Sequence, residues 1–297
     1  DIPVLLLGET GTGKDLAAIS LHRQSNRAQM PYLPVNLGSL PRELVASELF
    51  GHERGSFTGA NKQHIGVFER GSAGTVFLDE IDAIDEKVQI SLLRLIEQKK
   101  FTRLGGKRTI KTDARVIVAS NENLEEQVLK GAFREDLYYR LNVIKISLPP
   151  LRERSEDIAP LAYHFLRELN SKYQKRIERF DASVLKTFET YGWPGNIREL
   201  ENVIERMVIF ADTNQKNLTV DLLPDEFNLS MRSLSKKEFS GSGLEKIKAR
   251  KVLAERLAFL EILEKHHWNQ SAAARELGIN ESSLRYKLKR LKIKKRS

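Results

Sequence analysis

The sequence predicts an α/β domain built on a mostly parallel sheet, followed by helical modules. Five short β-rich runs alternate with helical stretches in the first half of the chain, and such alternation is typical of parallel strands covered by helices. A polar, Ser- and Gly-containing stretch then separates a last helical segment from the rest. The five runs are Val4–Leu7, Leu33–Val35, Thr75–Leu78, Arg115–Ala119 and Val143–Leu148.

Changes in pattern along the chain give the expected domain boundaries. The fifth run ends at Pro149-Pro150, and the pattern beyond it is helical up to about Ile209, with no further convincing strand. We therefore expect an α/β domain over residues 1–150, a small helical domain over 151–228, a flexible linker over 229–243 and a helical module over 244–297.

Composition excludes several classes of protein and locates a charged module. The 297 residues include no cysteine, which excludes disulfide frameworks and thiolate sites, and 40% are hydrophobic, which is ordinary for a globular protein. No apolar run is long enough to span a bilayer, and we expect a cytoplasmic protein. Residues 229–297 hold 18 Lys and Arg against 7 Asp and Glu, so the whole formal excess of +9 lies there. That asymmetry favours a polyanionic partner, nucleic acid or anionic membrane.

A glycine-rich turn between the first run and a predicted helix over Leu16–His22 has the pattern of a phosphate-binding loop. In that context backbone N–H groups and the helix N-terminus converge on phosphates, and Lys14 supplies a point charge to the β- and γ-phosphates. The usual Ser or Thr that would bind Mg²⁺ after the lysine is replaced by Asp15. The loop reads Gly8-Glu9-Thr10-Gly11-Thr12-Gly13-Lys14.

A pair of acidic residues, Asp79 and Glu80, ends the third run. In a nucleotide enzyme Asp79 would hold Mg²⁺, and Glu80 would orient and deprotonate the attacking water. Two acids after a strand are also a common helix-capping arrangement, but the phosphate loop some 65 residues upstream favours the catalytic interpretation.

These motifs, with one further loop, resemble the bacterial enhancer-binding proteins, the sigma-54-dependent transcription activators of the AAA+ ATPase class. The family carries a Gly-Ala-Phe-Thr-Gly-Ala loop that grips sigma-54, and this chain differs from it only at the second position. The resemblance implies a sigma-54 contact by the loop residues Gly55, Ser56, Phe57, Thr58, Gly59 and Ala60. The alternative from the residues alone is that Phe57 packs into its own domain.

The same resemblance assigns roles to residues that pattern alone would not single out. Asn36 would hydrogen-bond the catalytic Glu80 and couple nucleotide state to the loop, and Asn121 would be the sensor of the γ-phosphate. Arg134 and Arg140 would reach the nucleotide of a neighbouring subunit, whereas alone they fit a solvated helix face with ion pairs. Family members usually place Glu after the lysine, so Asp15 is a conservative change there.

The family resemblance also implies roles for residues of the helical domain and a missing segment before the first strand. Arg198, in the second sensor motif, would contact the phosphates in cis, while Trp193 is expected to pack in a core. The fold implied is an AAA+ P-loop ATPase with a five-stranded parallel sheet and a helical lid, which binds ATP and Mg²⁺. Family members carry a helix and loop before the first strand and a regulatory domain, so we expect the sequence to be a trimmed piece.

The last module has the pattern of a helix-turn-helix. Alanines at 272–274 allow close packing, Gly278 makes the turn and Asn280 can cap the second helix. The module resembles the Fis-like DNA-binding domain, and its second helix would enter the major groove of double-stranded DNA, with Leu284, Leu288 and Leu291 facing inward. The candidate DNA contacts are Ser282, Ser283, Arg285, Tyr286 and Lys289.

Together these features predict an ATP-driven transcription activator that binds upstream DNA and remodels sigma-54 RNA polymerase holoenzyme. We expect a homo-oligomer, from a dimer to a ring of six or seven subunits, and no membrane partner. Two alternatives are a DNA-binding repressor with weak or no hydrolysis, against which the near-intact loop argues, and a remodeller of some other protein. Metal sites beyond Mg²⁺ are not indicated.

Overall fold

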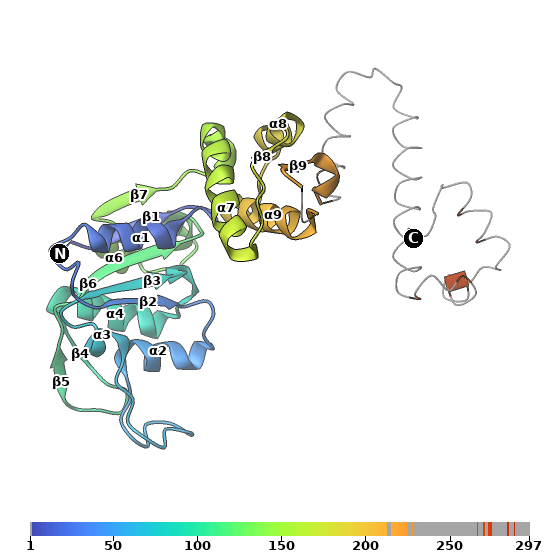
Figure 1. The fold of residues 1–297 in the computed structure, drawn as a ribbon. Helices are drawn as coiled ribbons and strands as arrows, with labels where there is room; N and C mark the ends of the chain where they lie inside the picture. Colours follow the sequence, from blue (N-terminus) through green and yellow to red (C-terminus); the bar gives the residue numbers. More distant parts are fainter. Residues whose placement is uncertain are drawn as a thin grey trace. The chain divides into compact units, whose positions relative to one another are not determined.

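We describe the chain from a computed structural model, in which it divides into two compact units, residues 1–228 and 229–297 (Figure 1). The structure describes residues 2–212, 215–224 and 227. In the second unit it describes only His266, Gln270, Ala273, Ala274, Leu284 and Leu288.

The first part of unit 1–228 is a parallel five-stranded sheet in the order β2-β3-β6-β1-β7, which confirms the predicted α/β class. Strands β1, β3 and β6 form its buried centre, and β7 lies at one edge with all four residues exposed. The strands are β1 (Val4–Leu7), β2 (Tyr32–Asn36), β3 (Thr75–Asp79), β6 (Arg115–Ser120) and β7 (Ile144–Ser147).

Helices cover both faces of this sheet (Figure 1). Alternate residues of β1 point to opposite faces, so Val4 and Leu6 pack with Ala18 of α1 while Leu5 joins a larger core with the other helices. The helices are α1 (Lys14–Arg23), α2 (Arg42–Phe50), α3 (Val67–Arg70), α4 (Glu86–Gln98), α5 (Leu124–Leu129) and α6 (Glu135–Leu141), with a 3₁₀ turn at Ile81–Ala83.

Two short strands outside the main sheet were not expected from the sequence. The strands β4 (Lys100–Thr102) and β5 (Thr109–Lys111) pair antiparallel as a hairpin. Each has three residues with lysine or threonine at its ends, which is too short a segment for a period-two pattern to be recognised.

The second part of unit 1–228 is a helical lid with its own core. Its helices are α7 (Ile158–Tyr173), α8 (Ala182–Thr190) and α9 (Asn196–Phe210). The two-residue strand β8 (Arg179–Phe180), between α7 and α8, pairs in parallel with β9 (Asn217–Leu218), which follows α9, and the sequence pattern predicted neither. Short 3₁₀ turns lie at Leu151–Glu153, Ser155–Asp157 and Val220–Leu222. Trp193 is fully buried and donates its indole N–H to Phe188 O at 2.7 Å, which confirms its expected place in a core.

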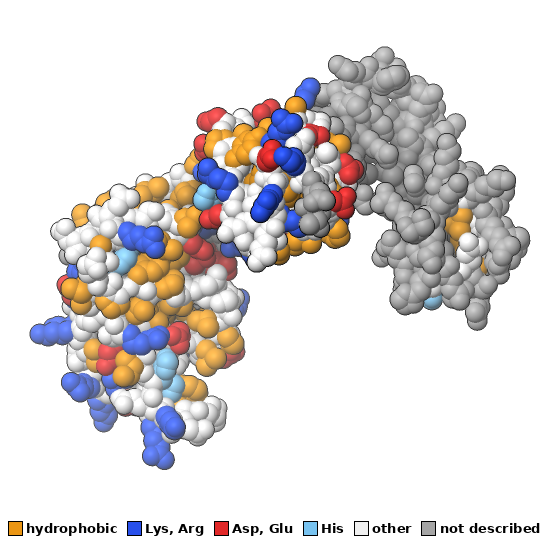
Figure 2. All heavy atoms as spheres, in the orientation of Figure 1, with side chains coloured by type: hydrophobic (Ala, Val, Ile, Leu, Met, Phe, Trp, Pro, Cys, Tyr) orange, Lys and Arg blue, Asp and Glu red, His pale blue; other side chains and the backbone are white. Residues whose placement is uncertain are grey.

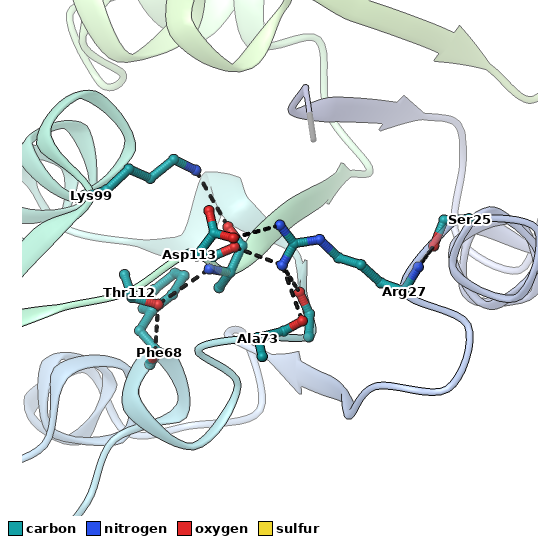
Figure 3. A network of polar contacts seen from close by, with 9 residues as sticks. Ser25, Arg27, Phe68, Ala73, Lys99, Thr112 and Asp113 are labelled. Atoms are coloured by element: carbon teal, nitrogen blue, oxygen red, sulfur yellow. Dashed lines mark hydrogen bonds and ion pairs between the residues drawn. The ribbon is translucent and has the colours of Figure 1, made fainter.

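Arg27, in the connection between α1 and β2, forms hydrogen bonds with the residues that precede the central strands β3 and β6 (Figure 3). Its guanidinium donates to the main-chain oxygens of Ala73 (3.0 Å), Gly74 (3.3 Å) and Asp113 (2.7 Å) and to the Asp113 carboxylate (2.9 Å). Ala73 and Gly74 precede β3, and Asp113 precedes β6. Because the Arg27 side chain is only 11% exposed, these charge-assisted bonds are poorly replaced by water.

Figure 2 shows both basic and acidic side chains on one face of the described part of unit 1–228. This agrees with the near balance of charge that the sequence gives residues 1–228. Among the described residues, no helix is both long and apolar enough to cross a membrane.

We predict that Arg27→Ala lowers the free energy of unfolding of the chain by about 2 kcal/mol, because it removes the largely buried guanidinium that bonds the Ala73 and Asp113 carbonyls and the Asp113 carboxylate. Chemical denaturation followed by circular dichroism measures the change. Arg23→Ala, which removes an exposed arginine of α1, is the matched control. Equal stability losses in the two variants would contradict the role given to Arg27.

Candidate active site

The glycine-rich turn between β1 and α1 is built to leave backbone donors free for a ligand. Gly11 and Gly13 have φ values of 80° and 97°, a region where a side chain would be strained. Helix α1 begins at Lys14, and Gly13 at its N-cap offers no side chain to occupy the first amides. These amides and the helix dipole therefore favour an anion at the turn.

The Lys14 ammonium lies among oxygen acceptors at the carboxyl edge of the sheet. It donates to Gly8 O at 2.8 Å, to Glu9 O at 3.1 Å and to the side-chain oxygen of Asn121, which follows β6. Burial lowers the pKa of Lys14, and the neighbouring charge of Asp79 opposes that shift. A buried cation of this kind interacts strongly with an anionic ligand.

The acidic pair lies beside Asn36, which is in register with Asp79 across β2 and β3. Asn36 Nδ2 donates to Glu80 Oε1 at 3.2 Å and to Asp79 Oδ2 at 3.3 Å. Glu80 has a φ of 56°, an uncommon backbone conformation for a residue with a side chain. Gly38, which no sequence motif singles out, leaves room for the carboxylate in this position, since a Cβ there would lie 1.9 Å from Glu80 Oε2.

One cavity of about 320 Å³ brings most of these residues together. It lies between the phosphate loop, the ends of three strands and the first turns of α9 in the lid. Its lining residues are Thr10, Gly11, Gly13, Lys14, Asp15, Leu16, Asn36, Asp79, Glu80, Asn121, Ile197, Arg198 and Glu201.

Three residues of the loop make other contacts. Thr12 is buried and its hydroxyl donates to Glu9 O at 2.8 Å, so it stabilises the turn itself. The Glu9 carboxylate binds Arg152 of the lid at 2.6 and 2.8 Å. At Gly8 a Cβ would lie 2.8 Å from Leu148 O, so this glycine permits close approach of the chain after β7.

Three acidic side chains, Asp15, Asp79 and Glu80, line the cavity close together. Burial raises the pKa of Asp79, and the nearby carboxylate of Asp15 raises it further. A divalent cation placed here would relieve that repulsion, so the donor set fits Mg²⁺. Within the described residues no three His, Cys, Asp or Glu side chains form a metal site by themselves, so phosphate or water oxygens would have to complete the coordination.

The two candidate finger arginines lie outside this cavity, on exposed surface. Arg134 immediately precedes α6 and donates to both carboxylate oxygens of Asp136, at 3.0 and 2.7 Å. Arg140 donates to Glu97 Oε1 at 3.0 Å. Their side chains are 36% and 59% exposed, so one copy of the chain does not bring them to its own site.

The loop over residues 55–60 is a turn closed by a hydrogen bond from Gly55 N to Ala60 O at 2.8 Å. Gly55 and Gly59 have φ values of 79° and 105°, and no described atom would contact a Cβ at either position. Phe57 is 39% exposed and touches the edge of the His52 ring, with centroids 4.9 Å apart. The loop thus presents an aromatic side chain that is only partly covered by its own domain.

The base of this loop is held by His52, to which no sequence motif gives a role, and by contacts of Ser56. His52 contacts the Ser47 hydroxyl of α2 at 2.7 Å and Lys62 O at 3.0 Å, and so links that helix to both arms of the loop. The Ser56 hydroxyl is buried without a hydrogen-bond partner among the described atoms. Ser56 packs against Gly105 in the β4–β5 turn, where a Cβ would lie 2.7 Å from the serine Cβ.

In the second unit, Ala273, Ala274, Leu284 and Leu288 are helical and buried, which confirms the inward position expected of the two leucines. Leu291 and the candidate DNA contacts lie outside the described residues. Those contacts are Ser282, Ser283, Arg285, Tyr286 and Lys289.

Comparisons with known proteins agree over nearly the whole chain. Residues 1–147 match the Sigma-54 interaction domain, 152–238 the AAA+ ATPase lid domain and 254–291 the Fis family of bacterial regulatory proteins. The regulatory protein AtoC of Escherichia coli is 42% identical over 96% of this chain and 61% of its own. The response regulator PilR of Pseudomonas aeruginosa is 40% identical over 98% and 64%.

A solved structure shows the same fold. The crystal structure of NtrX from Brucella abortus in complex with ADP matches with a TM-score of 0.72 and 28% identity, over 98% of this chain and 65% of that one. The chain thus spans less than two thirds of the length of these relatives.

We predict that Asp79→Asn stabilises the ligand-free chain at neutral pH, by about 1 kcal/mol. A carboxylate whose pKa is raised by folding contributes stability at low pH that is lost as the pH rises through the folded-state pKa. The advantage of the variant should therefore be smallest in acid and grow with pH.

Denaturant unfolding at a series of pH values measures this advantage. The control is Asp221→Asn, which changes an exposed carboxylate of the lid that does not line the cavity. An Asp79→Asn variant whose relative stability is the same at every pH would refute the electrostatic account.

Proposed function

The chain belongs to the bacterial enhancer-binding proteins, the sigma-54-dependent transcription activators of the AAA+ ATPase class, and we propose that it uses ATP hydrolysis to remodel sigma-54 RNA polymerase holoenzyme for promoter opening. The observation that carries this proposal is the single cavity shared by Lys14, Asp79 and Glu80. Lys14 would supply the cation for the phosphates, Asp79 the carboxylate for the metal and Glu80 the base, which are the groups that phosphoryl transfer to water requires.

Binding of ATP would begin at the phosphate loop. The first amides of α1 and the Lys14 ammonium would receive the phosphates, and Lys14 would exchange its bonds to Gly8 O and Asn121 for phosphate oxygens. Asp79 would hold Mg²⁺, which supplies positive charge against the charge on the phosphates. Arg198 lines the same cavity from the lid and would contact the phosphates in cis.

Hydrolysis would depend on Glu80 and on the residues that hold it. Glu80 would orient a water molecule and accept its proton as the water attacks the γ-phosphate. Asn36 donates a hydrogen bond to the Glu80 carboxylate. While this bond is formed, the carboxylate would be less able to accept a proton from water, so the base would stay inactive. Release of Asn36 would couple the state of the nucleotide to the segment between β2 and α2, and Asn121 would sense the γ-phosphate.

A neighbouring subunit would complete the site, and the working form would be a ring of six or seven copies, as the family resemblance implies. Arg134 and Arg140 are exposed and paired only with carboxylates of their own surface, so both can be presented to an adjacent copy. In other phosphoryl-transfer enzymes an arginine supplied in this way accelerates the reaction by about 10³- to 10⁵-fold.

The loop at residues 55–60 would make the contact with sigma-54. Support comes from the exposure of Phe57 and from the open space around Gly55 and Gly59, which lets the turn change shape. The His52 contacts would transmit a movement of α2 to Phe57. The buried Ser56 hydroxyl has no hydrogen-bond partner among the described atoms, which costs free energy in this conformation. The serine therefore favours a rearrangement of the loop in which the hydroxyl reaches water or a hydrogen-bond partner.

The second unit would hold the protein on double-stranded DNA upstream of the promoter. Its family match is a Fis-type DNA-binding domain, and residues 229–297 carry the whole positive excess of the chain. Ser282, Ser283, Arg285, Tyr286 and Lys289 would face the major groove, where phosphate contacts add affinity and base contacts add specificity.

We predict that Thr58→Ala keeps ATP turnover within about twofold of the unaltered chain but abolishes sigma-54-dependent open-complex formation, because Thr58 lies in the partner loop and not in the cavity. Phosphate release and an open-complex assay with purified sigma-54 holoenzyme measure the two activities. Thr190→Ala, at an exposed position ending α8, should retain both.

Two results would count against the proposal in different ways. Open complexes formed normally by Thr58→Ala would overturn the role of the loop. An unaltered chain that hydrolyses no ATP at any protein concentration would overturn the enzymatic part.

A further inference from the structure

The back of the phosphate loop is a docking site for the lid. In such a loop the backbone N–H groups point toward the ligand, so the carbonyl groups of the same peptides point the other way and need donors. Three consecutive carbonyls receive them from the lid. Thr10 O accepts from Asn196 Nδ2 (3.0 Å), Gly11 O from Ile197 N (2.9 Å) and Thr12 O from Arg154 Nη2 (3.0 Å).

The Glu9 carboxylate reinforces this contact. It accepts a bidentate pair of hydrogen bonds from Arg152, at 2.6 and 2.8 Å, and a third from Asn196 Nδ2 at 3.1 Å. These donors, Arg152 first, hold the pKa of Glu9 at about 2, so the group stays ionised throughout the neutral range. Glu9 therefore faces the lid, although its place in the loop suggests a nucleotide ligand.

Asn196 occupies the centre of the contact. It is fully buried, and its side-chain oxygen accepts from Leu151 N at 2.8 Å while its amide donates to Glu9 and Thr10. Its φ is 54°, and that of Trp193 nearby is 46°, so the turn that delivers α9 to the loop is held in an uncommon conformation. Strain of this kind persists only where surrounding contacts determine the structure.

Space is also restricted at this contact. A Cβ on Gly11 would lie 2.3 Å from Gly195 O, so the two turns touch backbone to backbone. The next two residues of the lid, Ile197 and Arg198, line the nucleotide cavity. The position of Arg198 therefore depends on how Asn196 is seated on the loop.

We propose that Glu9, Arg152 and Asn196 form a clamp between the phosphate loop and the lid. Through this clamp, binding of a ligand at the loop would set the position of the lid and of Arg198. A phosphate that binds the N–H side of a loop peptide shifts the carbonyl on the other side of the same rigid plane, and the lid is bonded to those carbonyls. The three side chains are positioning residues that contact the lid and the loop and not the reacting atoms. This inference rests on the proposed function, since it requires a nucleotide at the loop.

The clamp can be weakened without unfolding the chain. Arg152 and Glu9 are 43% and 42% exposed, so solvent screens their ion pair and limits what the low pKa of Glu9 adds to the free energy of unfolding. The bidentate geometry still fixes the orientation of the lid segment that carries Arg152 relative to the phosphate loop. The pair therefore affects the position of the lid more than the stability of the fold. Removal of either partner should therefore change nucleotide handling far more than melting temperature.

The test is the rate at which a fluorescent ADP analogue leaves the full chain, measured by stopped flow after displacement with excess ADP. We expect Arg152→Ala and Glu9→Gln each to release it ~10-fold faster, within the range typical of coupling between sites. Because the two residues act as one unit, the double variant should release it no faster than either single one. Arg176→Ala, an exposed lid position, should match the unaltered chain, and melting temperatures should be equal throughout.

The possible failures are distinguishable. An unaltered chain that binds no analogue would contradict the proposed function itself. Binding by the unaltered chain with unchanged release from Arg152→Ala and Glu9→Gln would overturn the clamp. So would independent effects that multiply in the double variant, or faster release that appears only with a lowered melting temperature.

Discussion

The two-sided peptide units of residues 10–12 constrain the geometry of the whole site. The carbonyl groups of Thr10, Gly11 and Thr12 are bonded to the lid, and the proposed phosphate site lies on the opposite side of the same loop. A shift of the loop would therefore be felt on both sides. Gly11 and Gly13 make this arrangement possible because their φ values suit only glycine. The lid, with its separate core around Trp193, is thereby linked to the α/β domain at the same place where the ligand would bind.

Electrostatics adds a second constraint. Lys14, Asp15, Asp79 and Glu80 share one cavity, and burial disfavours the charged forms of both Lys14 and Asp79. These buried charges lower the stability of the ligand-free site. A nucleotide with a bound cation would supply opposite charges to Lys14 and to the carboxylates. Such strain is typical of functional sites, where stability is given up for binding.

The sequence predicted the parts of the fold and site that depend on local pattern. The five strands of the main sheet follow from β-rich runs, and the loop from glycine spacing next to a lysine. The hairpin of β4 and β5 was missed because three-residue strands carry too little pattern, and Gly38 and Asn196 because their roles appear only when distant segments meet. Asn196 bonds to residues more than 180 positions away, and nothing in its neighbourhood signals Glu9. Glu9 itself was assigned by its place in the loop, whereas its contacts are with the lid.

We propose that each site is built by one chain and completed by its neighbour, and a mixture of two inactive variants can reveal this arrangement. Glu80→Gln lacks the base but offers intact Arg134, and Arg134→Ala lacks the finger but keeps an intact cavity. We predict that each alone hydrolyses almost no ATP, and that a mixture recovers turnover at sites that pair an intact cavity with an intact arginine. A mixture that stays inactive at every ratio, although both variants bind nucleotide and assemble, would contradict the account.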